Sequence, residues 1–468
     1  MANSQTFELK KNIPLMVVLL SGAFLTILNQ TLLATALPPI MKDLSVSEST
    51  VQWLQSIFML VNGIMIPITA FLIGKFTTRK LFLTAMSIFA FGTLIAAVSP
   101  NFQFLLIGRV FQGAGAGIMM PLLQTIMFLL FPIEQRGKAM GMFGLVIAFA
   151  PAIGPTLSGY LVDHFAWRSV FYVVLPIALI IIIAASILLK NVTELTNPKM
   201  DYLSIVLSTL GFGGLLYGFS IAGNTGWLHM NVWVALIIGS ITLFLFIKRQ
   251  LKLDEPILEF RVFKYRIFGL ATGLGMIVFA SMIATTVILP IFMQNLLGFS
   301  AFHSGLMLLP GAIVMGIMNP VSGALFDKYG AKWLLRIGFI ILTVTTFMFA
   351  YLSQETTFTH LAILNAVRMM GIAMVMMPST TLGLNELPNH LISHGTAMNN
   401  TFRQISGAVG TAVLVAITIT AASDNESISG AIEGVNVAFR VAGYIALFGL
   451  LLSLMVKDPK VIKKPSES

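Results

Sequence analysis

Three arginines stand inside long apolar stretches of this sequence, namely Arg109, Arg368 and Arg403. An arginine near the middle of a membrane-spanning helix costs roughly 2.5–3.5 kcal/mol on insertion scales, so its guanidinium must face a cavity or hydrogen-bonding partners. A guanidinium held in such a place can orient the polar group of a small molecule or couple a proton-transfer step. We therefore treat Arg109 and Arg368 as candidate residues of a substrate or proton cavity.

Amide side chains are expected at the depth of Arg109. The helix that contains Arg109 starts near Gln103, so at about 1.5 Å per residue Arg109 lies roughly 9 Å below that end. Asn29 and Gln30 fall in the outer part of the first apolar stretch, and Gln112 follows Arg109 by one turn. We predict that these amides meet Arg109 in the cavity. The alternative is a hydrogen-bond network between helices that has only a structural role.

Acidic side chains avoid the apolar stretches. All 18 aspartates and glutamates lie in loops or at the ends of these stretches, and so do the six histidines. A carboxylate inside the membrane is the ordinary proton carrier and the ordinary attractor of lipophilic cations. Its absence leaves the proton-carrying group unidentified. A positive interior is expected to favour neutral, zwitterionic or anionic amphiphiles over divalent cations.

Other kinds of chemistry find no support in the sequence. Cysteine is absent, and no metal-ligand cluster, nucleophile–base constellation or phosphate-binding loop is evident. We therefore expect no metal, no cofactor and no enzymatic activity.

The composition identifies a protein that crosses a membrane many times. Of the 468 residues, 57% are hydrophobic and only 10% are charged, whereas a soluble domain has about 25% charged residues. The mean hydropathy is +0.91, and apolar stretches of about 20 residues recur along the whole chain, as bilayer-spanning helices require. We predict fourteen spans, at residues 14–37, 51–73, 81–99, 103–130, 139–162, 169–189, 203–222, 232–248, 268–293, 304–326, 333–352, 359–384, 396–421 and 436–456.

Basic residues indicate how these spans are oriented. Apart from the three arginines within spans, only Lys42, Arg168 and Arg440 fall on the side opposite to the termini, and all other lysines and arginines fall on the side of both termini. The positive-inside rule then predicts that both termini are cytoplasmic. We expect the cytoplasmic membrane of a bacterium, with the net charge of +10 serving topology and anionic lipids, not nucleic acid.

The chain repeats itself. Residues 70–80 read AFLIGKFTTRK and residues 323–333 read GALFDKYGAKW, while the surroundings of Arg109 and Arg368 are also alike. Parallel repeats of this kind are a transporter architecture, with the substrate site near mid-depth between the halves. We predict a six-helix bundle over residues 1–190, two inserted helices with a cytoplasmic amphipathic loop over residues 191–266, and a second six-helix bundle with a cytoplasmic tail over residues 267–468. The loop, at about residues 249–267, is expected to lie on the cytoplasmic surface of the membrane.

One apolar stretch contains an unusual group of helix-weakening residues. Residues 150–159 read APAIGPTLSG, with Pro151 and Pro155 each removing a helix hydrogen bond. The small residues Gly154, Ser158 and Gly159 let a neighbouring helix approach closely. We predict a bendable seam that packs against the other half of the chain. Plain packing with an incidental kink is the alternative.

Several motifs are specific enough to compare with known families. Residues 28–31 read LNQT and residues 36–38 read ALP, residues 109–115 contain Arg-x-x-Gln-Gly-x-Gly, and residues 323–330 read GALFDKYG. With the Gly-Pro of residues 154–155, these resemble motifs of the major facilitator superfamily, in its fourteen-span drug:proton antiporter branch. The resemblance covers nearly the whole chain. It departs from the branch at Asn29, where an aspartate is usual, at Ser158, where a glycine is usual, and in the degraded first loop motif with Ala70, Gly74 and Thr77.

The resemblance implies an all-α membrane protein with the major facilitator fold, made of two six-helix bundles plus two inserted helices. It also implies that the 154–159 motif biases the rocking of the two halves. In the second half the complete loop motif, made of Gly323, Asp327, Lys328 and Gly330, is expected to latch the cytoplasmic ends of helices.

The implied function is multidrug efflux, and hence antibiotic resistance: a secondary active, proton-coupled antiporter that moves amphiphilic drugs out of the cytoplasm by alternating access. Its expected partners are small amphiphilic molecules, protons and the lipid bilayer, and it is expected to work as a monomer. Two alternatives stay open. One is export of an endogenous lipid, fatty acid or metabolite, and the other is a non-transporting membrane sensor.

Overall fold

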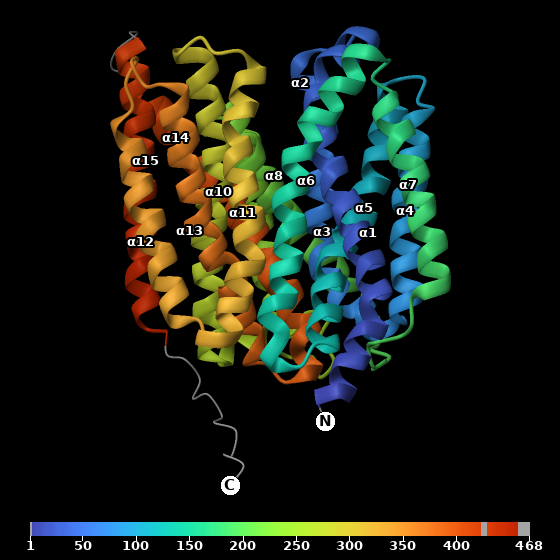
Figure 1. Cartoon of the computed structure of the whole chain (residues 1–468). Helices are drawn as coiled ribbons and strands as arrows, with labels where there is room; N and C mark the ends of the chain where they lie inside the picture. The colour runs from blue at the N-terminus through green and yellow to red at the C-terminus, as the bar shows by residue number, and fades with distance from the viewer. Residues whose placement is uncertain (1, 423–427, 457–468) are drawn as a thin grey trace.

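The computed structural model describes residues 2–422 and 428–456, and within them every regular element is a helix. Fourteen helices are long and apolar enough to cross a membrane, which confirms the all-α membrane fold. Figure 1 shows them as a set of long helices that run side by side between two faces. They are α1 (Ala2–Asp43), α3 (Trp53–Lys75), α4 (Thr78–Ala97), α5 (Phe102–Leu130), α6 (Arg136–His164), α7 (Ser169–Leu188), α8 (Tyr202–Thr225), α9 (Met230–Gln250), α10 (Arg266–Ile291), α11 (Ala301–Tyr329), α12 (Lys332–Met348), α13 (Phe358–Asn385), α14 (Ile392–Ala422) and α15 (Ile428–Leu454).

Short elements join some of these helices. They are α2 (Glu48–Val51), the 3-10 turns η1 (Ile133–Gln135), η2 (Phe260–Lys264), η4 (Phe349–Tyr351) and η5 (Asn389–Leu391), and the π-turn η3 (Phe292–Leu296). The expected cytoplasmic tail, residues 457–468, lies outside the described residues.

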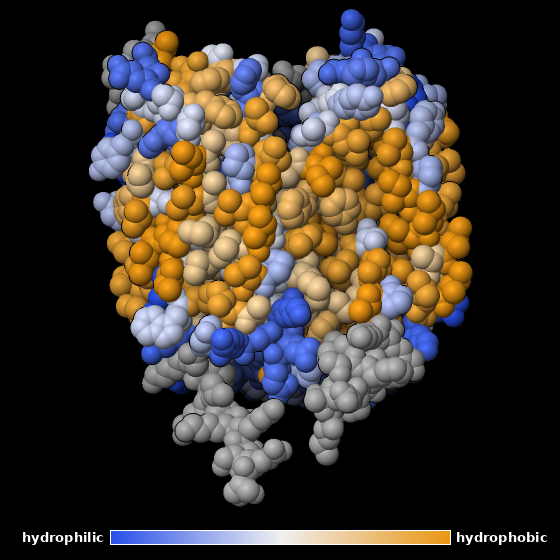
Figure 2. All heavy atoms as spheres, in the orientation of Figure 1, coloured by the Kyte–Doolittle hydropathy of each residue, from blue (hydrophilic) through white to orange (hydrophobic). Residues whose placement is uncertain are grey.

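The two faces of the molecule differ in charge. We call the face where α1 begins and α15 ends the basic face, since Lys75, Arg136 and Lys328 lie at the helix ends there. The opposite face is called the far face. In Figure 2 a wide apolar belt separates hydrophilic patches at these two faces, as expected of a protein surrounded by lipid.

The two series of helices repeat the same close packing. In the first series α4 meets α5 at Gly92 and Gly108, where an added Cβ on Gly92 would lie 2.6 Å from the Gly108 carbonyl oxygen. In the second series α12 meets α13 at Gly338 and Gly371 in the same manner. Glycines at such crossings let helix backbones touch. We refer to α1 and α3–α7 as the first bundle and to α10–α15 as the second bundle.

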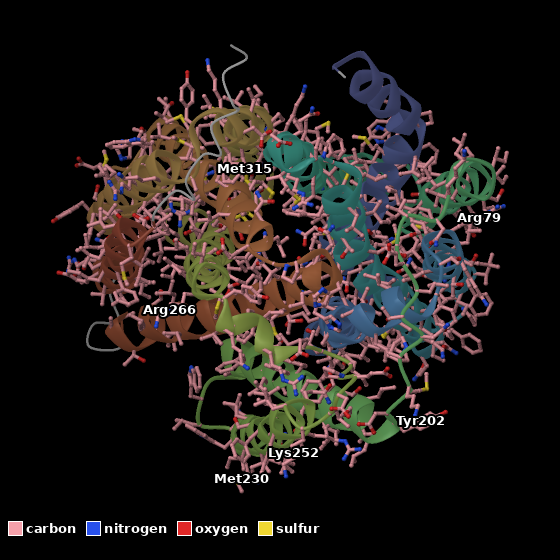
Figure 3. All side chains as sticks on the ribbon, turned by 90° about the horizontal axis from the view of Figure 1, so that it is seen from below. Arg79, Tyr202, Met230, Lys252, Arg266 and Met315 are labelled. Atoms are coloured by element: carbon pink, nitrogen blue, oxygen red, sulfur yellow. The ribbon has the colours of Figure 1, made fainter. Side chains whose placement is uncertain are left out.

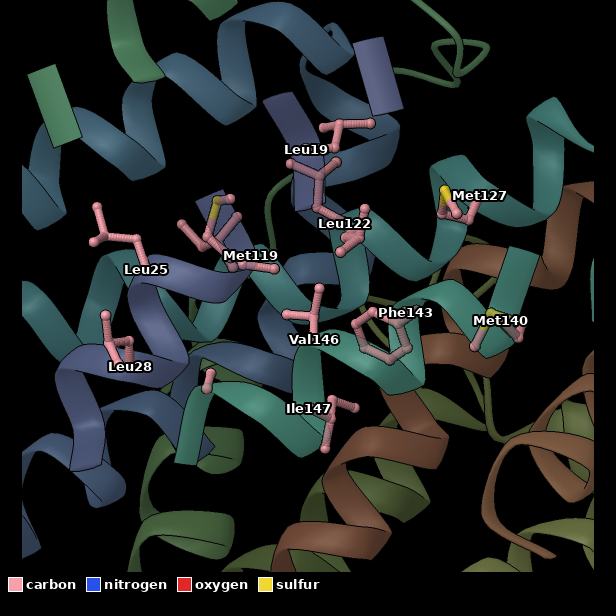
Figure 4. Packing of buried hydrophobic residues seen from close by; sticks show 14 of the residues in the cluster. Leu19, Leu25, Leu28, Met119, Leu122, Met127, Met140, Phe143, Val146 and Ile147 are labelled. Atoms are coloured by element: carbon pink, nitrogen blue, oxygen red, sulfur yellow. The ribbon is translucent and has the colours of Figure 1, made fainter. Parts of the chain in front are cut away.

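Most of the interior of the first bundle is apolar. Side chains of α1, α5 and α6 interdigitate there, including Leu25, Met119, Phe143 and Val146, and Figure 4 shows several of them. Such packing fixes the relative positions of these three helices, which carry most of the candidate site residues.

The two inserted helices, α8 and α9, pair with each other at the side of the molecule. Figure 3, seen from the basic face, shows Tyr202, Met230 and Lys252 on this side, with Met315 of α11 on the opposite side. Helix α8 packs against both α3 and α14, so it touches both bundles. The carboxylate of Asp201 accepts hydrogen bonds from Nε and Nη2 of Arg249 at 2.7 and 3.0 Å, which ties the start of α8 to the end of α9.

The loop after α9 folds onto the protein. We expected an amphipathic stretch on the membrane surface, but Ile257, Leu258 and Val262 are fully buried. The side-chain oxygen of Gln250 accepts hydrogen bonds from the backbone N–H groups of Ile257 and Leu258. The apolar side of the loop therefore covers the protein instead of the lipid.

Candidate functional site

The Arg109 guanidinium donates hydrogen bonds to three partners. Its Nη1 donates to the Asn29 oxygen of α1 and to the Gln112 oxygen one turn away, each at 2.8 Å. Its Nε donates to the Leu54 carbonyl of α3 at 3.0 Å. The structure therefore brings Arg109, Asn29 and Gln112 together, whereas Gln30 is half-buried and forms no hydrogen bond with the guanidinium.

This cluster lies inside the first bundle. The Arg109 side chain is fully buried, and its guanidinium stands 4.3 Å from the ring centre of Phe58. Gln112 extends the cluster by donating to Thr93 of α4 at 2.9 Å. All of these partners belong to helices of the same bundle. The arrangement therefore fits a hydrogen-bond network with only a structural role as well as it fits a role in a cavity.

Arg368 has a similar place in the second bundle. Its Nη2 donates to the backbone carbonyl and the hydroxyl of Ser281 on α10, at 2.9 and 2.6 Å. Its Nε donates to Thr346 of α12 at 3.3 Å. Arg368 is fully buried, and these partners too are internal to one bundle.

The two bundles touch each other tightly toward the basic face, where α6 meets α11. The carboxylate of Asp327 accepts hydrogen bonds from the backbone N–H groups of Gly137 and Lys138, at 2.7 and 2.8 Å. These N–H groups belong to the first turn of α6, which has no partners for them within the helix. A carboxylate from one bundle thus caps a helix of the other, where the helix dipole favours negative charge.

The other loop-motif residues support this cap. Gly323 packs directly onto the Gly137 backbone, with no room for a Cβ at either residue. Gly330 ends α11 with a φ of +79°, a left-handed conformation that favours glycine. Lys328 is exposed, and its ammonium stands 5.0 Å from the ring centre of Tyr329.

The degraded first copy of the loop motif makes a different contact. Gly74 stands where Asp327 stands in the second copy, and its carbonyl accepts hydrogen bonds from the backbone N–H groups of Thr196 and Asn197. Thr77 caps α4 by accepting from the Lys80 N–H. The first motif therefore holds the segment that leads to α8, and the carboxylate cap exists only in the second motif.

Further contacts between the bundles continue along α6 toward the far face. Gly141 and Gly144 face Asn319 of α11, and the Asn319 amide donates to the Gly144 carbonyl at 2.8 Å. The last glycine contact on this line is between Gly316 of α11 and the ring of Phe149. These small residues bring the two helices into backbone contact.

A second line of contacts joins α5 to α14. The hydroxyls of Thr125 and Thr396 lie 2.7 Å apart, and the Asn400 amide donates to the Gln124 oxygen at 2.5 Å. Within the described residues, the hydrogen bonds between the two bundles all lie toward the basic face. At the far face, Figure 2 shows a hollow between the two bundles.

The 150–159 stretch does not form the seam that the sequence led us to expect. Helix α6 runs without a break through Pro151 and Pro155. A Cβ on Gly154 would collide with Thr31 of α1, which belongs to the same bundle, and nothing lies within 4 Å of a Cβ on Gly159. Ser158 is fully buried. The contact with the other half lies closer to the basic face, because Gly137, Gly141 and Gly144 face α11.

Sequence reasoning missed this contact line and the Gln124–Asn400 pair. The spacing of Gly137, Gly141 and Gly144, at three and four residues, places them on one helix face. That periodicity is the signal that would have found them. It was obscured because α6 contains many small residues.

Comparisons with known proteins agree with this architecture. The sequence pattern of the Major Facilitator Superfamily matches residues 19–411. The chain belongs to this superfamily, which is a family of transporters and not of enzymes. It is a multi-pass membrane transporter of small molecules, as the motifs indicated.

Particular relatives are similar over nearly their full length. An uncharacterized MFS-type transporter, YcnB of Bacillus subtilis, is 55% identical over 96% of this chain and 95% of its own. The lincomycin resistance protein LmrB of Listeria monocytogenes is 42% identical over 96% of this chain and 97% of its own. Among solved structures, the human organic anion transporter MFSD10 shares the fold, with a TM-score of 0.70 at 14% identity, covering 94% of this chain and 99% of its own.

Proposed function

We propose that this chain is a proton-coupled antiporter that exports amphiphilic drugs from the cytoplasm by alternating access. The observation that carries the proposal is the one-sided contact between the bundles. Hydrogen bonds and glycine contacts join them toward the basic face, while a hollow separates them at the far face. Alternating access requires an interface of this kind, which can open on one side as it closes on the other.

The proposed orientation places the basic face in the cytoplasm of a bacterial cell, with both termini inside. The charge distribution supports this orientation through the positive-inside rule. The structure then corresponds to a state that is closed toward the cytoplasm and open to the outside. A drug would leave the protein from this state.

The substrate class follows from the charges inside the molecule. Arg109, Arg368 and Arg403 are buried, and the ion pairs of the described residues involve none of these three arginines. Those pairs are Arg168–Asp43, Arg249–Asp201, Arg261–Glu259 and Arg440–Glu433. A fixed positive interior favours neutral, zwitterionic or anionic amphiphiles and disfavours divalent cations.

The similarity to a lincomycin resistance protein supports the drug-export proposal. Export of an endogenous lipid, fatty acid or metabolite would use the same fold and the same alternating contacts. We propose that the working unit is a monomer, since each bundle closes against the other within one chain.

The experiment is transport into inverted membrane vesicles with a panel of neutral, anionic, monovalent and divalent cationic fluorescent amphiphiles. The proposal predicts accumulation of the neutral and anionic probes against their gradient, and loss of accumulation when an uncoupler collapses the proton gradient. Accumulation that survives the uncoupler would contradict proton coupling. Equilibration without accumulation would contradict active export and favour a channel or sensor.

A further inference from the structure

Arg403 differs from the other two buried arginines in how few of its donors are used. It is only 4% exposed, and its Nε and Nη1 find no hydrogen-bond acceptor in the part of the chain that the structure describes. Arg109 and Arg368 each leave a single nitrogen unpartnered. A buried cation without an acceptor is costly, and such a cost is characteristic of a functional site.

The position of Arg403 on α14 places it where the two bundles stop bonding to each other. Thr396 and Asn400 are bonded to Thr125 and Gln124 of α5. Arg403 follows Asn400 by three residues, on the same side of α14 and one turn nearer the far face. Helix α5 runs in the opposite direction, and three residues before Gln124 it contains Pro121, which offers no side-chain acceptor.

Arg403 has further polar neighbours without partners. The Asn399 oxygen, four residues before Arg403 on α14, is buried and accepts no hydrogen bond. On the other bundle the Gln124 amide nitrogen is buried and donates none, although its oxygen is bonded to Asn400. Unpaired donors of Arg403 and Gln124, which belong to different bundles, and the unpaired acceptor of Asn399 therefore lie close to the hydrogen bond that joins Asn400 to Gln124.

An aromatic ring covers one face of the guanidinium. The Arg403 guanidinium carbon stands 5.0 Å from the ring centre of Phe279 on α10, and Phe279 also contacts Gly407, the next turn of α14. Stacking of this kind stabilises a cation and holds the guanidinium plane, so that its N–H edge is presented to a ligand.

We infer that Arg403, with the amide nitrogen of Gln124 beside it, forms a subsite that binds the carboxylate of an amphiphilic substrate. The inference rests on the proposed export function and names one chemical class of substrate for it. A carboxylate supplies two acceptor oxygens for the unused N–H groups, in charge-assisted hydrogen bonds. Phe279 and the surrounding apolar helices suit the apolar body of the same molecule.

The test is equilibrium binding to the purified full-length protein in lipid nanodiscs. The probes are 11-(dansylamino)undecanoic acid and its methyl ester, in which a methyl group replaces the carboxylate charge and the rest of the molecule is the same. We expect the wild type to bind the acid more tightly than the ester. Arg403→Gln should raise the Kd of the acid by about tenfold or more, as the loss of charge-assisted hydrogen bonds implies, and leave the Kd of the ester unchanged.

Three more variants distinguish loss of binding from a simple folding defect. Arg403→Lys keeps the charge and should weaken acid binding less than Arg403→Gln. Asn399→Asp places a carboxylate four residues from Arg403, so it should compete for the guanidinium and weaken binding of the acid alone. Arg440→Gln removes an exposed arginine in the middle of α15, which is paired with Glu433, and should change neither Kd.

The outcomes separate the subsite from other roles. Equal weakening of acid and ester in Arg403→Gln and Asn399→Asp would overturn the proposal, because it indicates a structural role. A wild type that binds the acid no more tightly than the ester, or binds neither, would also overturn it. Failure of active export in vesicles would refute the proposed function and leave a charge-selective binding result standing.

Discussion

At the scale of single residues, the missing aspartate of the first span defines the electrostatics of the interior. Asn29 occupies that position, and its oxygen accepts a hydrogen bond from Arg109 while its amide nitrogen has no partner. An aspartate in its place would make the same contact through an ionised oxygen. The buried charge of Arg109 would then be largely neutralised.

We predict that Asn29→Asp shifts selectivity from neutral and anionic amphiphiles toward monovalent lipophilic cations. For a substrate about 8 Å from the added charge, an effective dielectric constant of about 20 gives roughly 2 kcal/mol, or more than tenfold in relative efflux. Efflux of a quaternary-ammonium dye and of a neutral antibiotic is to be measured at equal expression. Gln30→Glu is the matched control, since it adds the same charge one residue away at a side chain that forms no hydrogen bond with Arg109.

An unchanged ratio of dye to antibiotic efflux in Asn29→Asp would contradict this electrostatic account. Robust export of a divalent cationic dye by the wild type would contradict it too. The three buried arginines take part in none of the ion pairs of the described residues, so the interior should repel a divalent cation.

At the scale of helices, α6 has two functions that occupy different parts of its length. Its first turns hold the contact with α11 through Gly137, Gly141 and Gly144. Its later turns, around Gly154, pack against α1 of the same bundle. A motion of the two bundles would therefore separate the first contact while it preserves the second.

We predict that Gly154→Leu blocks export, because the added side chain would push α6 away from Thr31 of α1. Gly159→Leu lies in the same motif but meets open space, so it should export at the wild-type rate. Vesicle transport at matched protein level, together with the thermal unfolding midpoint, measures both effects. Equal transport by the two variants would show that the contact at Gly154 has no importance for export.

The inserted helices permit a pH test. The hydrogen bonds from Arg249 hold the pKa of Asp201 below its ordinary value. A carboxyl group with a lowered pKa in the folded state stabilises the fold above its unfolded pKa of about 3.9, and this contribution is lost as the pH falls through the folded value.

Asp201→Asn should therefore lower the thermal unfolding midpoint slightly at pH 7, by about 2 °C, and the difference from wild type should shrink as the pH approaches 3. Glu433→Gln breaks the exposed pair with Arg440 and serves as the control, with no change expected because exposed pairs contribute little. A midpoint difference that persists at pH 3 would contradict the ionic origin of the effect.

The sequence predicted the elements better than their contacts. Long apolar stretches and the one-sided lysines and arginines determine the fourteen spans, because the lack of water in the bilayer leaves few alternatives. Counting residues from the start of each helix also predicted that Arg109 lies near Asn29, since it placed both side chains at a comparable depth in two antiparallel helices. It did not determine which helix faces which, because many helix faces of this chain are equally apolar.

The errors follow from this limit. The 154–159 motif was assigned to the wrong partner, since small residues show that a helix approaches closely without showing which helix. The loop after α9 was expected on the lipid surface, but Gln250 pairs with its backbone and draws its apolar side chains inward. The unused donors of Arg403 were invisible in sequence, because a missing partner is a property of three-dimensional neighbours.

At the scale of the whole molecule, the account makes one central claim: export requires the two bundles to separate toward the basic face. The chain contains no cysteine, so pairs of cysteines can be introduced without removing any. Thr125 and Thr396 are suited to this, since their hydroxyl oxygens lie 2.7 Å apart across the contact between α5 and α14. A disulfide there would fix the closed contact.

A matched pair within one half serves as the control. The hydroxyl oxygens of Thr78, at the start of α4, and Thr193, after α7, lie 3.1 Å apart. The double variant Thr78→Cys/Thr193→Cys therefore introduces a comparable cross-link that does not join the two bundles.

The decisive measurement is drug uptake into inverted vesicles by Thr125→Cys/Thr396→Cys before oxidation, after oxidation and after reduction. The account predicts that oxidation abolishes uptake and that a reducing agent restores it, while the Thr78→Cys/Thr193→Cys protein keeps its uptake throughout. Undiminished uptake by protein that is fully cross-linked between Thr125→Cys and Thr396→Cys would contradict alternating access through this interface.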